Sequence, residues 1–188
     1  MTTDNKTAEA SCEVGITGRV VTRIWDSDAL ERHYPAWPEL SKAAKLSYLS
    51  EPSEWPVAPK HVGHSTNVVL DNYLEALASG DSPQPTHLAI SDDDTEPSGS
   101  DEEMPGEVFR TALGQDEGDG RDRLTSTLIG QDEANGHDLV KIGFANGPDP
   151  ADSEHLTANL LPESDRVEPK TSDVTVQYDY ILEYKRVD

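Results

Sequence analysis

The chain has 188 residues, and its 37 Asp and Glu against 15 Lys and Arg give a net charge of −22 at pH 7. This length suits one domain with a core of its own. Nucleic acids and anionic membrane surfaces are bound through clustered Lys and Arg, so the acidic excess argues against both as partners. No apolar run approaches the roughly 18 residues that a membrane span needs, so we expect no membrane insertion.

The acidic residues run from Asp4 to Asp188 and Lys is scarce beside them. This pattern is typical of proteins adapted to molar salt, where a Debye length of about 3 Å screens self-repulsion. The alternative is an ordinary acidic protein. Three Trp, six Tyr and regular apolar alternation argue against a disordered acidic tail. Cys12 is the only cysteine, which excludes an intrachain disulfide and a thiolate metal cage.

The N-terminal third divides into an arm and a longer, mixed segment. Residues 1–14 have no apolar period, and no signal peptide is visible among them. Residues 15–25 (GITGRVVTRIW) alternate with Ile16, Val20 and Ile24 on one face, which predicts a strand. Up to residue 65 the chain is rich in Pro and Trp, with one helix predicted at 38–49. We therefore expect residues 15–65 to form a leading strand plus a Pro- and Trp-rich helical insertion.

A second helix is predicted at 67–79 (NVVLDNYLEALAS), with Asn67 as its N-cap and Gly80 at its C-terminal end. A short strand, THLAI, follows at 86–90. Residues 91–105 are strongly acidic and have too few apolar side chains for a core, so they predict an exposed loop.

The rest of the chain reads as strands separated by turns. Strands are predicted at 107–112, 123–129, 138–144, 155–161 and 173–184, with a tight turn at EANG (133–136). The last of them places Val174, Val176, Tyr178, Tyr180, Leu182 and Tyr184 on one face. The predicted fold class is α+β, mainly β: an antiparallel β-sandwich, jelly-roll or Ig-like, spanning 66–188 with one or two short helices and a Pro-rich N-terminal insertion.

Candidate metal ligands are few. His61 and His64 have a spacing that can bind a metal when a third ligand converges, against the plainer reading of two solvent-exposed histidines. Asp92, Asp94, Glu96 and Glu103 match carboxylate positions of a calcium loop, but Pro97 replaces the glycine that its turn requires. With Asp93, these residues would bind Ca²⁺ or Mg²⁺ weakly and without specificity. We predict no cofactor and no specific metal site.

No nucleophile constellation, phosphate-binding glycine loop or metalloprotease motif occurs, so we predict a protein that is not an enzyme. The residues with most contact potential are Trp25, Trp37 and Trp55. Large aromatic side chains in a Pro-rich segment either pin that segment to the core or anchor a partner. A second hypothesis is glycan recognition, with Trp37 and Trp55 stacking on sugar rings and Asp92, Asp93 and Asp94 binding hydroxyls. A third, glycan hydrolysis, would need two facing carboxylates in a cleft.

From Thr66 to Tyr184 the order of segments resembles a module in structural proteins of tailed viruses and prophages. The resemblance rests on the helix at 67–79, THLAI, EVFR at 107–110, EANG at 133–136, KIGF at 141–144 and the KTSD turn at 170–173 before a long alternating strand. The chain departs from the pattern in its acidic loop, where that module has small uncharged residues, and at Lys141, where it has an acidic residue.

The resemblance, taken with the composition, implies a virion component of a tailed virus of a halophilic archaeon, on the tail, baseplate or capsid surface. Such modules act as symmetric oligomers. The expected partners are copies of the chain itself and other virion proteins, with host surface glycans as the alternative. The expected location is the virion, assembled in the host cytoplasm.

Overall fold

The structure is a computed structural model that describes residues 13–50, 57–81, 83–118 and 122–187. It is mainly β with short helices, which confirms that part of the predicted fold class. The strands are β1 (Glu13–Asp26), β2 (His61–Val69), β3 (His87–Ser91), β4 (Glu107–Ala112), β5 (Gln115–Gly118), β6 (Asp122–Ile129), β7 (Lys141–Ala145), β8 (His155–Leu160) and β9 (Val174–Val187). The helices are α1 (Ser27–His33), α2 (Lys42–Leu49) and α3 (Asp71–Ser79), with 3₁₀ turns η1 (Trp37–Glu39) and η3 (Glu163–Asp165).

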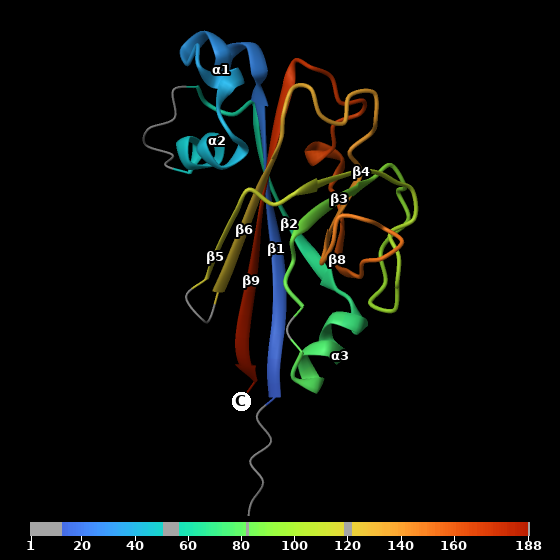
Figure 1. Cartoon of the computed structure of the whole chain (residues 1–188). Helices are drawn as coiled ribbons and strands as arrows, with labels where there is room; N and C mark the ends of the chain where they lie inside the picture. Colours follow the sequence, from blue (N-terminus) through green and yellow to red (C-terminus); the bar gives the residue numbers. More distant parts are fainter. Residues whose placement is uncertain (1–12, 51–56, 82, 119–121, 188) are drawn as a thin grey trace, which may run out of the picture.

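All nine strands belong to one sheet of order β4-β3-β7-β8-β2-β1-β9-β6-β5, and every neighbouring pair is antiparallel. The long strands β1 and β9 form its axis, paired from Glu13↔Val187 to Asp26↔Val174 (Figure 1). Strand β2 pairs with β1 over seven residues but with β8 only at Val68 and Val69. The sheet therefore bends at β2 into two halves.

The two ends of this sheet lie next to each other in the chain. Strands β4 and β5 are the outermost strands and are joined by Leu113 and Gly114 alone. The Leu113 N–H donates to the carbonyl of Thr86, beside β3, whereas the Gly114 N–H donates to Ser126 in β6. The chain thus crosses from one edge of the sheet to the other within two residues, and the sheet is nearly closed.

The main core lies between the two halves. Alternation sends Val20, Val176, Tyr178, Tyr180 and Leu182 inward from β1 and β9, as the sequence predicted. They meet buried side chains from the β3, β7 and β8 half: Leu88, Ile90, Ile142, Phe144 and Leu156. The rings of Phe144 and Tyr180 stack with centroids 4.4 Å apart.

A second, smaller core lies on the outer face of the β1, β9 and β6 half. Trp25 and Leu128 point outward from β1 and β6 and pack against Leu30, Trp37, Leu46 and Leu49 of the helices. Helices α1 and α2 therefore cover one end of this face, at the top of the view in Figure 1. The predicted helix at 38–49 divides into η1 and α2, where Ser41 caps α2 by accepting from the Ala44 N–H.

The start of the second predicted helix was wrong. Residues 61–69 form β2, and α3 begins only at Asp71. Asn67 does not cap the helix: its side-chain amide donates to the Tyr180 hydroxyl, 2.8 Å away. Pairing with β1 outweighs local helix propensity here, because β2 gains a ladder of hydrogen bonds along seven residues. The end was right, since Gly80 has a φ of 91° and closes the last turn.

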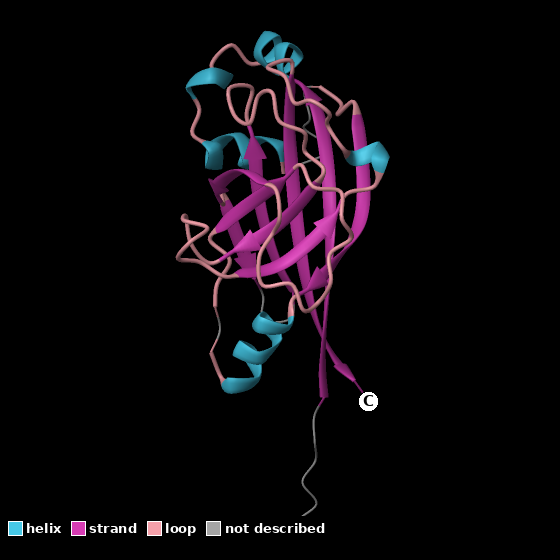
Figure 2. Cartoon of the chain, turned by 90° about the vertical axis from the view of Figure 1, so that its right-hand side faces the viewer, coloured by secondary structure: helices cyan, strands magenta, loops and turns pink. Residues whose placement is uncertain are grey.

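Strands β1 and β9 continue past the rest of the sheet as a two-stranded ribbon, residues 13–16 with 184–187. In the described part of the chain these residues pair only with one another, because β2 pairing begins at Gly18 and β6 pairing at Glu183. Figures 1 and 2 both show the two strands extending beyond the other strands near the C-terminus. Among the described strands, none lies beside either outer edge of this ribbon.

Candidate functional site

Two of the three tryptophans singled out from the sequence are buried in the second core. Trp25 is 0% exposed and Trp37 is 3% exposed. Trp37 lies edge-on to Tyr48 of α2, with ring centroids 6.2 Å apart. These two rings pin the helical segment to the sheet. Trp37 also lines the cavity described below. Trp55 lies outside the described residues.

The acidic loop does not gather its carboxylates into one site. Asp93 turns inward, where its Oδ1 accepts from Lys141 Nζ at 2.7 Å, and this contact is the main reason that the pKa of Asp93 is lowered. Asp92, Asp94 and Glu103 are exposed, and Glu96 lines a shallow groove beside β2. Within the described ranges no three His, Cys, Asp or Glu side chains lie close enough to hold a metal ion. Weak cation binding by this loop stays a prediction.

Lys141 of β7 is 2% exposed, and its partner Asp93 lies in the acidic loop. This pair therefore ties the acidic loop to the edge of the core at β7.

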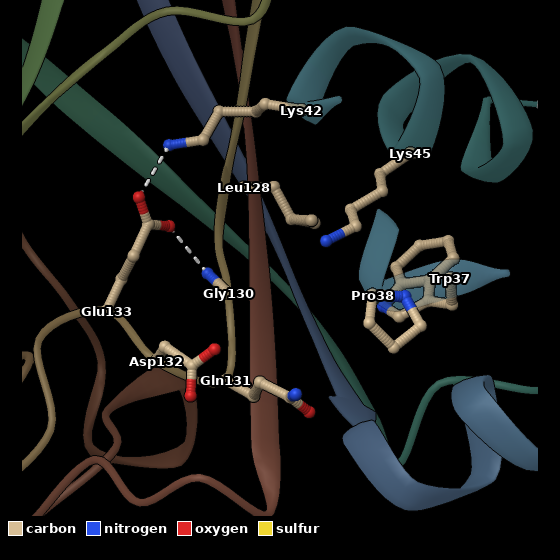
Figure 3. A pocket seen from close by; sticks show the side chains of 9 residues that line it. All are labelled: Trp37, Pro38, Lys42, Lys45, Leu128, Gly130, Gln131, Asp132 and Glu133. Carbon is tan, nitrogen blue, oxygen red and sulfur yellow. Dashed lines mark hydrogen bonds and ion pairs between the residues drawn. The ribbon is translucent and has the colours of Figure 1, made fainter. Parts of the chain in front are cut away.

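A cavity lies between the helical segment and the turn that follows β6 (Figure 3). Its volume is about 210 Å³. Trp37, Pro38 and Leu128 form an apolar wall. Opposite them stand polar side chains from α2 and from the turn: Lys42, Lys45, Gln131, Asp132 and Glu133.

Two of the cavity's charged groups neutralise each other. Lys42 Nζ lies 3.1 Å from Glu133 Oε1 and donates to Thr111 Oγ1 at 2.6 Å. The other oxygen of Glu133 accepts from the Gly130 N–H at 2.8 Å. Glu133 thus closes its own turn and ties that turn to α2, so this pair shapes the cavity.

A buried lysine beneath the turn fixes it further. Lys170 is 0% exposed, and its Nζ donates to the carbonyls of Gly130 and Thr171 and to Asn135 Oδ1, at 2.8 to 3.1 Å. Because these acceptors are uncharged, burial dominates and lowers the pKa of Lys170 to about 8. The turn at 130–136 is therefore held from both sides.

Three polar side chains around the cavity make no hydrogen bond with any described residue, although the charge of Asp132 acts on nearby Lys170. Lys45 Nζ stands 5.5 Å from the centroid of the Trp37 ring, and within the described ranges no carboxylate pairs with it. The side chains of Gln131 and Asp132 likewise have no hydrogen-bond partner among the described residues. Figure 3 shows Lys45 reaching from α2 toward Leu128 and Pro38, with Gln131 and Asp132 on the turn below Gly130.

Two buried titratable clusters lie elsewhere. Arg110 makes a bidentate pair with Glu107 at 2.6 and 2.7 Å and contacts His155 Nε2 at 3.0 Å. Burial, and then the Arg110 charge, lower the pKa of His155, so its imidazole is neutral near pH 7. Arg110 also binds the Gly147 carbonyl and Ser153, so this cluster joins β4, β8 and the loop after β7.

The second cluster centres on Asp165 in η3, which is 2% exposed. Its Oδ1 accepts from Ser164 at 2.9 Å and lies 2.8 Å from His61 Nε2. His61 and His64 sit on opposite faces of β2, one facing each side of the sheet, so the two histidines do not converge on a metal. His61 instead ties β2 to η3.

Sequence reasoning did not identify the polar groups of the cavity. These residues come from α2 and from a turn far along the chain, at 131–133, and each is an ordinary surface residue by type. The weak available signal was the EANG turn, which predicted where the chain reverses but not what the turn would face.

No family model, no curated protein and no solved structure matches this chain. In the described residues no helix is long and apolar enough to cross a membrane.

Proposed function

We propose that the protein is a non-enzymatic structural component of the virion of a tailed virus of a halophilic archaeon, on the tail, baseplate or capsid surface, where it assembles as a symmetric oligomer. The observation that supports this best is the ribbon of residues 13–16 and 184–187. The two facing halves of the bent sheet would act as the sandwich expected of such a module, and the Pro- and Trp-rich helical part of residues 15–65 would be its N-terminal insertion.

The ribbon is suited to assembly because its backbone is incomplete alone. A two-stranded ribbon in water is marginally stable and gains from a third strand. Four residues in each strand span about 13 Å, and no described strand pairs with the outer edges of this segment. Elsewhere the sheet protects its edges by bringing β4 and β5 together. The ribbon is therefore the natural place for a strand from a second copy to pair.

Rotational symmetry fits a ribbon with two unlike edges. One edge belongs to β1 and the other to β9, so pairing the β1 edge of one copy with the β9 edge of the next is head to tail. Such contacts close into rings when the rotation is right. The charge of −22 on each copy opposes this in dilute buffer and is screened in molar salt, so association should strengthen as salt is raised.

The test is the molar mass by light scattering in molar KCl and in dilute buffer, for the intact chain and for Val14→Pro and Gly15→Pro. Neighbouring residues of a strand point their N–H groups to opposite edges, so one of these prolines removes an outward N–H and the other an inward one. We expect the intact chain to have the molar mass of an oligomer in high salt. Of the two proline variants, the one that removes an outward N–H should have the molar mass of a monomer and keep its fold. A monomer for the intact chain in molar salt would overturn the proposal.

The location is tested separately. Mass spectrometry of purified virus particles from the source should detect this chain in stoichiometric amounts. Its absence from the particles would reject the virion assignment even if the chain oligomerises.

A further inference from the structure

We propose that the cavity between α2 and the 130–133 turn binds a single neutral sugar ring, held by Lys45, Gln131 and Asp132 against the apolar wall of Trp37, Pro38 and Leu128. This site shares Trp37 with the glycan contacts expected from sequence, but it uses neither Trp55 nor the acidic loop. It does not depend on oligomerisation.

The volume of the cavity limits the size of the ligand. Sites for drug-sized ligands occupy roughly 300 to 1,000 Å³. At about 210 Å³ this cavity holds one small ring. A larger ligand, such as an oligosaccharide or a nucleotide, would extend from the cavity into solvent. An oligosaccharide could therefore bind only through one of its sugar units.

The side chains that line the cavity determine the chemical class of the ligand. The wall of Trp37, Pro38 and Leu128 suits C–H groups, whereas the opposite side offers hydrogen-bonding groups of every kind. Asp132 accepts only, Lys45 donates only, and the Gln131 amide does both. A ring with an apolar face and several hydroxyls, each both donor and acceptor, satisfies all of these groups together.

Charge favours a neutral ligand. Lys42 is neutralised by Glu133, and the remaining Lys45 and Asp132 carry one charge of each sign. Asp132 would repel an anion and Lys45 would repel a cation, whereas neither residue would repel an uncharged polyol. In a chain with more than twice as many acids as bases, Lys45 lines the cavity without an acidic partner among the described residues.

The site is also preorganised. Glu133 and Lys170 fix the turn that carries Gln131 and Asp132, and the packing of Trp37 fixes η1. Binding therefore costs little ordering beyond the Lys45 side chain. The cavity lies near α2, at the opposite end of the molecule from the ribbon in Figure 1, so both can be used in one assembly.

The test is saturation-transfer NMR and titration of the intact chain in molar KCl with the methyl glycosides of glucose, galactose and mannose. We expect saturable binding of at least one glycoside, with a Kd on the order of 1 mM. Lys45→Met and Asp132→Asn should each weaken it about tenfold or more. Asp138→Asn, an exposed carboxylate that does not line the cavity, should leave it unchanged.

Three results would overturn the proposal. One is no saturable binding of any of the three glycosides up to roughly 100 mM. Another is binding that both Lys45→Met and Asp132→Asn leave intact, which would place it elsewhere. The third is displacement of the glycoside by acetate or glycine at equal concentration, which would make this a site for anions or zwitterions. Far-UV circular dichroism of each variant separates lost binding from lost folding.

Discussion

The carboxylate of Asp165 fills the space beside the α-carbon of Gly63, where any other residue would carry a side chain. The glycine in β2 therefore allows a buried carboxylate to lie against the inner face of the sheet and reach His61. Close approach, and not a left-handed backbone, requires glycine at this position.

Gly63→Ala should lower the free energy of unfolding by roughly 2 to 3 kcal/mol, because the added methyl group displaces a buried carboxylate from its hydrogen bonds. Denaturant unfolding in molar salt measures this. The double variant Gly63→Ala/Asp165→Ala should lose less than the sum of the two single changes, since the clash is gone. Additive losses would show that the two residues do not compete for this space.

Leu49 and Leu74 form a matched pair for testing the second core. Both are helical leucines, but Leu49 in α2 is 1% exposed against Trp25 and Trp37, whereas Leu74 in α3 is 39% exposed. Leu49→Ala should cost about 2 to 4 kcal/mol and Leu74→Ala less than about 0.5 kcal/mol. Equal losses measured by urea unfolding would contradict the packing of α2 on the sheet.

Lys170 should make stability rise with pH in the alkaline range. Its pKa is lowered from 10.5 to about 8 in the folded chain, so between those values the unfolded state binds more protons. The free energy of unfolding should therefore increase from pH 8 toward pH 10, by at most roughly 1 kcal/mol per pH unit. Lys170→Met should remove this increase. The comparison with the variant isolates Lys170 from other groups that titrate there, and identical pH profiles for the two proteins would contradict the prediction.

Asp93 should be the one carboxylate of the 92–94 run that matters for stability, because it alone pairs with the buried Lys141. Asp93→Asn should lower the melting temperature, whereas Asp92→Asn and Asp94→Asn should not. The pKa of Asp93 is lowered in the folded chain, so its contribution is present above pH 4 and is lost as pH falls further. A gap between wild type and Asp93→Asn that persists below pH 3 would point to another cause.

Strand periodicity located most of the β-structure from sequence, since burial on one face leaves a period of two. It found β1 through Ile16, Val20 and Ile24, and β9 through Val174 to Leu182. It missed β2, because Gly63, Ser65 and Asn67 face inward there and bind polar partners, so no apolar alternation exists to be seen. The order of the strands, and the meeting of β4 with β5, depend on pairings between distant segments that a local pattern does not encode.

The candidate site was harder to predict from the sequence than the strands were. Trp37 was singled out as a contact residue, but whether its ring faces solvent depends on Tyr48 and Leu46 packing beside it. Lys45 and Asp132 line the same cavity only because the fold brings the turn after β6 against α2. They are far apart in the chain, so no local sequence pattern relates them.

The pairing of β1 with β9 also constrains how this fold can be reached. These two strands stand at opposite ends of the described chain, so the pairing that forms the axis of the sheet is complete only after β9 has been synthesised. Local helices and the β3–β4 and β7–β8 hairpins can form early, because each joins nearby segments. Contacts of such long sequence separation form slowly, so closure of the body should be the slow step of folding.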